Sequence, residues 1–338
     1  MNPVEALREI GFLLERSRAD TYRVRAYRGA ADALAGMSEN ERRHHQEQGT
    51  WAKVSGVGPK TATVITQAMA GQVPEYLQKL RDEKRPLVEG GLNMRAAIKG
   101  DLHCHSSWSD GGSPLEEMMI TAEALGHEYC AITDHSPRLQ VARGLSADRL
   151  RQQVAVVAEL NEVMAPFRCL RGIEVDILED GSLDQDDELL GELDIVVSSV
   201  HSKLRSDSET MTHRMVGGIV NPRTNILGHC TGRLIEGERG TRPQSVFDPE
   251  VVFEACRTFN VALEINSRPE RRDPPTRLLQ MAIDMGCLFS IDTDAHAPGQ
   301  LEFQIYGCQR AEDLGLDPDR VINTWPADEL LAWCAKAK

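Results

Sequence analysis

The sequence predicts a two-domain protein in which a small all-helical domain precedes an α/β domain built as a seven-stranded barrel. The chain has 338 residues, and at roughly 150 residues per domain this length favours two domains. Apolar residues recur at helical spacing up to about residue 85, whereas short β-rich runs alternate with helical segments from Lys99 onward. Such alternation over about 240 residues is typical of a parallel sheet, and a closed, TIM-like (β/α) barrel is its economical form.

The N-terminal domain, residues 1–85, is expected to contain only helices and to be followed by a linker. Apolar spacing predicts its helices over 4–16, 22–35, a run that reaches Ala70, and Glu75–Arg81. The stretch from Ser38 to Gly49 is polar. Pro86 and the pair Gly90-Gly91 predict a linker over residues 86–98.

Seven β-rich runs and the helices between them make up the second domain, residues 99–338. The runs are Lys99–His103, Tyr129–Thr133, Cys169–Val175, Ile195–Val200, Asn225–Leu227, Val261–Ile265 and Leu288–Asp292. Helical segments between them include Pro114–Leu125, Ala147–Met164 and Pro249–Thr258. In a parallel barrel all strand carboxyl ends open onto one face, which is where the active sites of this architecture lie.

Composition excludes several classes of protein. Hydrophobic residues make up 41% and charged residues 27%, which excludes wholesale disorder. No apolar run approaches the ~18 residues that span a bilayer, and the N-terminus carries charges where a signal peptide is apolar. We therefore expect a cytoplasmic protein without a membrane partner. The eight cysteines form no Cys-x-x-Cys pair, which predicts reduced, mostly buried thiols.

The net charge of −14 is unevenly distributed. Residues 1–99 carry 16 Lys and Arg against 12 Asp and Glu, a net charge of +4. Residues 100–338 carry 22 against 40, a net charge of −18. The total argues against a polyanionic partner, but its distribution leaves a mildly basic domain that is suited to one.

Polar ligand-type residues gather where the predicted strands end. Six of the ten histidines lie at these strand ends, joined by three carboxylates. Imidazole and carboxylate are ligands for zinc, manganese and iron, and nine ligands are too many for one ion. The sequence therefore predicts two or three divalent ions, a cluster that generates a hydroxide to attack phosphorus and clamps the phosphate oxygens. The candidate ligands are His103, His105, Asp110, His135, Glu174, His201, His229, Asp294 and His296.

The strand-end motifs resemble, in order and spacing, those of the polymerase and histidinol phosphatase (PHP) family. They read DLHCHSSWSDG, ITDHS, GIEVDI, SSVHS, GHCTGR, LEIN and DTDAH, within residues 99–338. The resemblance implies a distorted seven-stranded barrel, the PHP fold, with a trinuclear metal site and every ligand position retained. It groups the ligands as His103, His105, Glu174 and Asp294; Asp110, His135 and His296; and Glu174, His201 and His229.

Further polar residues at the same face have candidate roles in binding substrate. A guanidinium fork suits non-bridging phosphate oxygens, and the GHCTGR motif makes Arg233 the leading candidate. Asp176 and Asp292 are expected to hydrogen-bond ligating histidines, and Cys104 and Cys230 to lie in the core. The candidate catalytic residues are Arg233, Asn266, Arg268, Arg271 and Lys203.

The N-terminal domain carries a second motif, at Ser55–Ala62. Gly56 and Gly58 permit a tight turn between helices, and backbone N–H groups at the following helix are placed to meet a DNA phosphate without reading bases. Lys60 and Arg25 are the further candidate DNA contacts, and a helix–helix turn in a small bundle is the structural alternative. Positive charge nearby comes from Arg16, Arg18, Arg23, Arg25 and Arg28.

This domain resembles the small N-terminal domain of family X DNA polymerases over about residues 1–85. The resemblance rests on FLLERSRADTYRVRAYRGAADAL and VSGVGPKTATVITQAMAGQVPEYLQKLR. Bacterial members of that family carry a PHP domain at the C-terminus. Here only about 15 residues separate the two modules, which excludes the polymerase core and polymerase activity. Val64 occupies the position of the family's Schiff-base lysine, so lyase activity is not expected.

These observations favour a metal-dependent phosphoesterase that acts on DNA. Such an enzyme would be a 3′–5′ exonuclease or would process 3′ ends or abasic sites in DNA repair. The first alternative is a phosphate monoesterase of the histidinol-phosphatase type. The second is a non-catalytic DNA-end-binding protein whose metals are structural.

Overall fold

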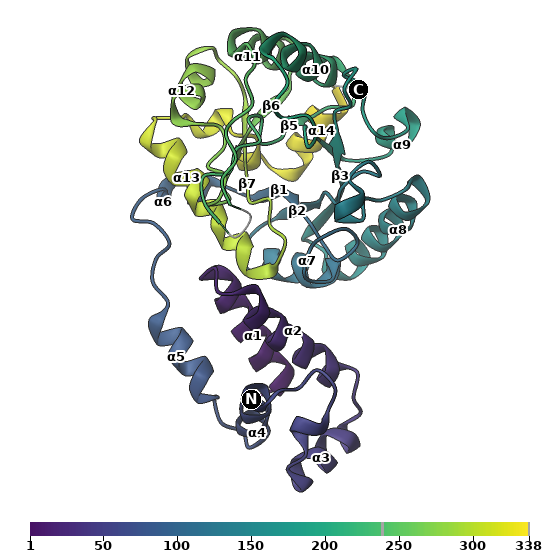
Figure 1. The fold of residues 1–338 in the computed structure, drawn as a ribbon, viewed down its shortest axis with the longest axis vertical. Coiled ribbons are helices and arrows are strands. Elements are labelled where there is room, and N and C mark those ends of the chain that lie inside the picture. Colours follow the sequence, from purple (N-terminus) through teal and green to yellow (C-terminus); the bar gives the residue numbers. More distant parts are fainter. Residues whose placement is uncertain (238–239, 337–338) are drawn as a thin grey trace. The chain divides into compact units, whose positions relative to one another are not determined.

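The computed structural model describes residues 1–237 and 240–336. The chain divides into two compact units, Met1–Pro86 and Leu87–Lys338 (Figure 1). The first contains only helices and the second is an α/β barrel, as the sequence predicts. Among the described residues, no helix is both long and apolar enough to cross a membrane.

The first unit is a small helical bundle around an apolar core. The core includes Leu7, Ile10, Leu34, Ile65 and Leu77, none of which is more than 1% exposed. The side chains come from helices at different places in the sequence, so the core holds the bundle together. The helices are α1 (Pro3–Arg16), α2 (Thr21–Ala35), α3 (Glu39–Gln48), the 3₁₀ turn η1 (Trp51–Lys53), α4 (Pro59–Met69) and α5 (Glu75–Glu83).

The polar stretch at 38–49 forms helix α3, although none of the residues within this helix is buried. Its ends are defined by side chains and backbone instead. The Ser38 hydroxyl accepts from the Glu41 N–H and the Glu41 carboxylate accepts from the Ser38 N–H, which is a capping box. Gly49 ends the helix in the left-handed region at φ 61°.

The expected linker at 86–98 is shorter than the sequence predicts, because its second half belongs to the barrel unit. Helix α6 (Leu92–Ala97) buries Met94 in the barrel core. The Glu312 carboxylate accepts from the Gly91 N–H at 2.8 Å and from the Met94 N–H at 2.6 Å. These bonds satisfy donors at the start of the helix and anchor the chain ahead of the first strand.

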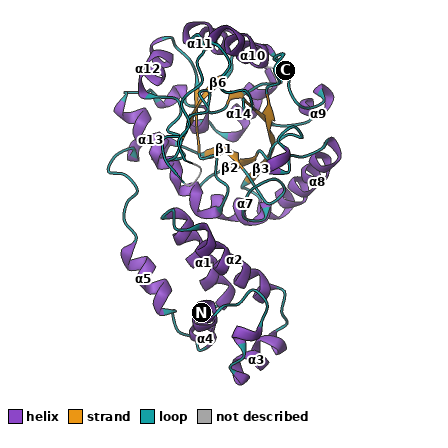
Figure 2. Ribbon diagram, viewed as in Figure 1, coloured by secondary structure: helices purple, strands orange, loops and turns teal. Residues whose placement is uncertain are grey.

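Within the described residues, seven parallel strands form one sheet in sequence order, enclosed by helices (Figure 2). The strands are β1 (Gly100–Cys104), β2 (Tyr129–Ile132), β3 (Arg168–Asp176), β4 (Ile195–Ser199), β5 (Ile226–Leu227), β6 (Ala262–Asn266) and β7 (Phe289–Asp292). The helices are α7 (Leu115–Ala124), α8 (Ala147–Met164), α9 (Asp187–Gly191), α10 (Ser208–Val220), α11 (Pro249–Thr258), α12 (Thr276–Asp284), α13 (Gln304–Asp313) and α14 (Ala327–Lys336). All seven predicted strands are present. The eight cysteines are buried and free, with Cys104 and Cys230 in the core.

The barrel closes between β1 and β7 by two different means. At the carboxyl ends, the Asp294 N–H donates to the His103 carbonyl at 2.8 Å and the His105 N–H donates to the Ala295 carbonyl at 2.7 Å. At the amino ends, buried Asn323 lies between the strands. Its amide accepts from the Ile291 N–H at 2.8 Å and donates to Gly100, Ile291 and Asp292 oxygens.

We expect the Asn323→Ala variant to destabilise the barrel unit by about 2–4 kcal/mol, because it leaves several buried polar groups without partners. Urea unfolding followed by circular dichroism measures the change. Gln280→Ala, a substitution on the outer helix α12, serves as the control. If both variants unfold at the wild-type midpoint, other contacts hold the seam.

Candidate metal centre

The nine residues predicted as metal ligands lie together at the mouth of the barrel. Each is at the carboxyl end of a strand or in the loop that follows, because parallel strands direct these ends to one face. Six of the side chains are buried, and Asp110, His201 and His296 are partly exposed. The nine are His103 and His105 from β1, Asp110 from the loop after β1, His135 after β2, Glu174 on β3, His201 after β4, His229 after β5, and Asp294 and His296 after β7.

The carboxylate of Glu174 lies at the centre of the cluster. It is 1% exposed, and five histidines from four strand ends surround it. The distances from Glu174 Oε1 are 2.9 Å to His229 Nε2 and 3.2 Å to His201 Nε2, and those from Oε2 are 2.8 Å to His135 Nδ1, 3.4 Å to His103 Nε2 and 3.5 Å to His105 Nε2. One carboxylate at the meeting point of so many imidazoles has the arrangement of a bridging ligand.

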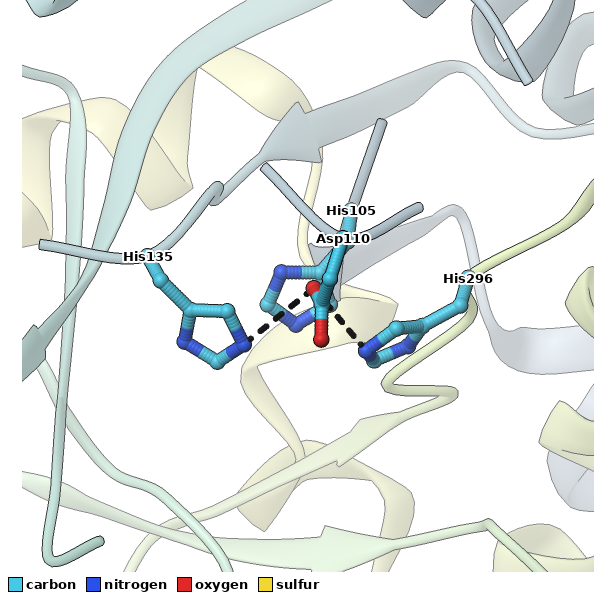
Figure 3. Close-up of side chains that lie close together, drawn as sticks. All are labelled: His105, Asp110, His135 and His296. Atoms are coloured by element: carbon cyan, nitrogen blue, oxygen red, sulfur yellow. Dashed lines mark ion pairs between the residues drawn. The ribbon is translucent and has the colours of Figure 1, made fainter. Parts of the chain in front are cut away.

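The ligand-type atoms fall into overlapping groups, each close enough to surround one ion. Figure 3 shows one group, in which Asp110 points between His135 and His296 with His105 beside them. Asp110 Oδ1 lies 3.5 Å from His135 Nε2 and 3.4 Å from His296 Nε2. The other groups are His103, His105 and Asp294, and His135, Glu174 and His201. His105 and His135 each belong to two of these groups. In the grouping that the resemblance implies, Glu174 is the one residue shared between two groups.

The donor set fits divalent metal ions. Several buried atoms of these side chains have no hydrogen-bond partner within the described ranges, among them His201 Nε2 and Glu174 Oε1, which face each other at 3.2 Å. Buried polar atoms are normally satisfied, so lone pairs converging without protons between them need a cation.

Electrostatics favours the metal-binding protonation state for some of these groups and opposes it for others. Burial alone would raise the pKa of Glu174, but His201, His103 and His135 outweigh it and hold the pKa well below its usual value. Burial, with His296 and His135 nearby, lowers the pKa of His105 to about 3. Burial alone would also lower the pKa of His103 and His201, but Glu264 and Glu174 outweigh it at His103 and raise its pKa well above the usual value, while Glu174 and Asp176 raise the pKa of His201 to about 9. A charged carboxylate beside a neutral imidazole is the state that ligation requires.

Glu264 on β6 has a role in the site that the sequence analysis missed. Its Oε1 lies 2.6 Å from His103 Nδ1, and its Oε2 accepts from the backbone N–H of His229. The Asn266 amide also donates to Oε2, at 3.2 Å. A carboxylate on Nδ1 fixes the ring orientation and leaves Nε2 facing the cluster. The LEIN motif contained the signal, because Glu264 sits at a strand end beside two ligand-bearing strands.

The two aspartates expected to hydrogen-bond ligating histidines have different roles. Asp176 Oδ1 accepts from the backbone N–H of His201 at 3.1 Å and lies 3.5 Å from His201 Nδ1, an atom that has no hydrogen-bond partner among the described residues. The prediction for Asp292 is wrong, since its carboxylate accepts from the Leu102 N–H and from Asn323 in the barrel seam. Asp292 precedes the ligand Asp294 by two residues, so it lies below the cluster.

Three of the candidate catalytic residues contact the cluster. Arg271 Nε donates to Asp294 Oδ2 at 3.0 Å, and Arg271 Nη1 is buried without a hydrogen-bond partner in the described structure. The Asn266 amide donates to the same Asp294 oxygen at 3.1 Å. Arg268 Nη1 lies 2.9 Å from His296 Nδ1 and 3.2 Å from the Asp294 carbonyl.

The other two lie elsewhere. Arg233 donates from Nε and Nη2 to the backbone carbonyls of Arg271 and Arg272, so two of its donors brace the loop that carries Arg271. Its expected contact with the substrate phosphate stays a prediction. Lys203 is exposed and has no side-chain contact with the cluster in the described residues.

The hairpin candidates lie on the surface of the first unit. Gly56 has φ +85°, which favours glycine, and a Cβ there would approach the Gly29 carbonyl to 3.4 Å. Gly58 and Lys60 are exposed at the start of α4, where first-turn N–H groups have no intrahelical partner.

The arginines that the sequence analysis counted toward this surface differ in environment. Arg25 is exposed. Arg28 instead makes a buried two-pronged ion pair with Glu15, at 2.7 Å for both bonds, and supports the bundle.

Comparisons with known proteins define the class of this chain. Residues 2–73 match the family model described as a helix-hairpin-helix domain, and residues 101–267 match the one described as a PHP domain. The chain therefore combines a helix-hairpin-helix domain with a PHP domain, and it belongs to the PHP class of metal-dependent phosphoesterases. Residues 74–100 alone separate the two matches, which leaves no room for a polymerase core between them.

Individual relatives share one or both domains. The chain is 41% identical over 226 residues to "DNA polymerase/3'-5' exonuclease PolX" of Bacillus subtilis, covering 67% of this chain but only 39% of that relative. It is 26% identical over 208 residues to a "Probable phosphatase" of Caldicellulosiruptor bescii, covering 59% of this chain and 80% of the relative.

A solved histidinol phosphate phosphatase from Lactococcus lactis, complexed with zinc, L-histidinol and phosphate, aligns with a TM-score of 0.47 and 17% identity. The alignment covers 65% of this chain and 95% of that one. A similarity this low assigns no function.

We expect Glu264→Gln to weaken Mn²⁺ and Zn²⁺ binding about 10- to 100-fold, because an amide cannot accept from both His103 and the His229 N–H. Competition with a chromogenic chelator measures the affinity. Glu162→Gln, on the exposed face of α8, removes the same charge and should leave the affinity unchanged. Equal metal affinity in the two variants would show that Glu264 does not contribute to metal binding.

Proposed function

We propose that this protein is a metal-dependent phosphoesterase that acts on DNA, as a 3′–5′ exonuclease or in processing 3′ ends or abasic sites. The observation that carries the proposal is a complete nine-residue ligand cluster in the same chain as an exposed helix-hairpin-helix. The B. subtilis relative, whose name includes a 3'-5' exonuclease, supports it. The phosphatase-named relatives favour a small-molecule phosphate monoesterase as the second candidate.

In this proposal the nine candidate ligands hold two or three divalent ions, Zn, Mn or Fe. Ions bound there act as Lewis acids toward a phosphate ester and lower the pKa of a coordinated water. Glu174 and the imidazoles around it would supply ligand atoms to these ions. Glu264 orients His103, and Asp176 orients His201.

The residues beside the cluster bind and orient the substrate. Arg271 uses Nε on Asp294 and has Nη1 available, which suits a non-bridging phosphate oxygen. Asn266 and Arg268 fix Asp294 and His296. Arg233 holds the carbonyls of the loop that presents Arg271.

The hairpin supplies the DNA contact. The first turn of α4, next to exposed Gly58 and Lys60, lies where the helix dipole favours an anion, and the Lys60 side chain adds positive charge. Such contacts bind phosphates without reading sequence. Together with the net charge of +4 on residues 1–99, they favour this unit as the DNA-binding part of the protein.

A Mn²⁺-supplemented activity panel tests the function. We expect turnover of a 5′-labelled duplex, of 3′-phosphate DNA or of abasic DNA, and we expect Lys60→Glu to lower kcat/KM on DNA about tenfold through loss of one phosphate contact. The same variant should leave a small phosphate ester unaffected, because Lys60 lies outside the barrel.

Three outcomes separate the candidate functions. The proposal is supported if the wild type turns over DNA and if Lys60→Glu lowers turnover of DNA but not of the small phosphate ester. Turnover of histidinol phosphate with none of DNA identifies the monoesterase. Binding of DNA ends with no turnover of any substrate identifies the non-catalytic alternative.

We expect Arg271→Gln to lower kcat on a small phosphodiester about 100-fold, because one donor to the developing negative charge is lost. Bound metal, measured by mass spectrometry, should stay at the wild-type level, since Asn266 still holds Asp294. Arg277→Gln, an exposed substitution on α12, is the control. Loss of metal together with activity would show that Arg271 supports the ligand rather than the phosphate.

A further inference from the structure

Several arginines on the outer surface of the second unit are ion-paired, although exposed Arg277 on α12 makes no side-chain bond to the described residues. On outer helices and at strand amino ends, arginines bind nearby carboxylates. The N–O distances are 2.6 Å for Arg168–Asp328, 2.7 Å for Arg171–Asp194, 2.9 Å for Arg223–Asp187 and 2.6 Å for Arg257–Glu254. Such pairing is expected in a domain where carboxylates outnumber cations.

Four cations around the barrel mouth depart from this pattern. Their side chains are exposed and make no hydrogen bond or ion pair with residues 1–237 or 240–336. Each closely follows a residue of the site along the chain. They are Arg138, three residues after His135; Lys203 and Arg205, two and four residues after His201; and Arg272, directly after Arg271.

The carboxylate that contacts the Arg138 backbone does not pair with the Arg138 side chain. Asp184 accepts from the Ser136 hydroxyl and from the backbone N–H of Arg138, and not from the Arg138 guanidinium. Glu270 lies 3.7 Å from Arg268 rather than beside Arg272. The four charges are therefore directed to solvent around a site that receives a phosphate ester in the proposed function.

The backbone supplies an independent observation. Lys203 has φ 52° and Arg272 has φ 45°, in the left-handed region that side-chain-bearing residues rarely adopt. Arg143, in the loop after β2, and the ligand Asp294 also have a positive φ. Among the described residues of the second unit, the remaining non-glycine residue with a positive φ is Asn260, and asparagine tolerates this conformation. Such conformations cluster at functional sites, which supports a role for Lys203 and Arg272.

We propose that Arg138, Lys203, Arg205 and Arg272 form a cationic rim that binds phosphates of a DNA strand on either side of the ester at the metal centre. This inference rests on the proposed function and deepens it, because it makes a polymeric strand the substrate class. A small monoester presents one phosphate, for which Arg271 suffices. Unpaired cations on three separate loops match a ligand that carries a negative charge on every nucleotide.

The test compares two double variants of the full-length protein. Lys203→Gln with Arg272→Gln removes two rim charges, and Arg168→Gln with Arg257→Gln removes two paired charges away from the mouth. The substrates are a 5′-labelled single strand of about 20 nucleotides and the small diester bis(p-nitrophenyl) phosphate, with Mn²⁺ at about 100 mM salt.

We expect the rim variant to lose about tenfold in kcat/KM on the oligonucleotide and less than about twofold on the small diester. The slope of log binding constant against log salt concentration, measured by fluorescence anisotropy, should fall by about 1.4, since each lost contact to a single strand contributes about 0.7. The control variant should match the wild type in every measurement.

Other outcomes overturn the rim. Equal losses on both substrates would show that Lys203 and Arg272 stabilise the structure of the metal centre. An unchanged reaction with the oligonucleotide, together with an unchanged salt slope, would show that the DNA strand does not contact these residues. Failure of the wild type to hydrolyse either diester would instead refute the exonuclease form of the proposed function. The salt slope still decides the rim in that case, because binding needs no turnover.

Discussion

The mouth of the barrel depends on one buried charge, the carboxylate of Glu174. An ionised carboxylate at 1% exposure is costly unless opposite charge or hydrogen bonds compensate it. Here the compensation comes from histidines on β1, on the loop after β2 and on the loops after β4 and β5. The ends of four strands must therefore stay in register around a side chain carried by a fifth, β3. Metal binding and the local fold of this face are coupled for the same reason.

The sheet satisfies this requirement by closing unevenly. At the carboxyl ends, backbone bonds join β1 to β7 and bring Asp294 and His296 to the cluster. At the amino ends, the gap is filled by polar side chains, since Asn323 and Gln304 both donate to the carbonyls of Gly100 and Ile291. The seam between β1 and β7 is thus closed by backbone bonds near the site and by side chains at its other end.

The sequence was sufficient for the parts of the structure that depend on local pattern. Strands were predictable because each apolar run is followed by polar ligand-type residues, and the match to the observed bounds is close even for the two-residue β5. Helix α3 was not predicted because it buries nothing, although its capping box, Ser38 and Glu41, is legible in the sequence. The predicted linker was too long because Gly90-Gly91 indicates a turn in the sequence. The sequence does not show that Glu312, more than 200 residues away, accepts hydrogen bonds from the start of helix α6.

The site required tertiary information that no motif contains. Asp292 and Glu264 are both strand-end acids, and only the relative height of neighbouring strands decides which one meets His103. Arg233 stands in a ligand-bearing motif, yet its long side chain reaches the carbonyls of the loop after β6. The alternation of side chains along a strand predicts which face of the sheet a residue lies on. The partner of a long side chain depends instead on how loops from different parts of the chain pack together.

Charge shows the same difference between local pattern and spatial arrangement. A net charge of −18 on residues 100–338 argues against nucleic acid, but carboxylates held by arginines on outer helices, or committed to a metal cluster, do not repel a strand at the mouth. Bound divalent ions add positive charge at the centre of that face. What distinguishes a nucleic-acid enzyme from a monoesterase here is therefore not the ligand cluster, which suits either substrate. In the proposed function, the distinguishing features are the unpaired cations on three loops around the cluster and the exposed hairpin in the first unit.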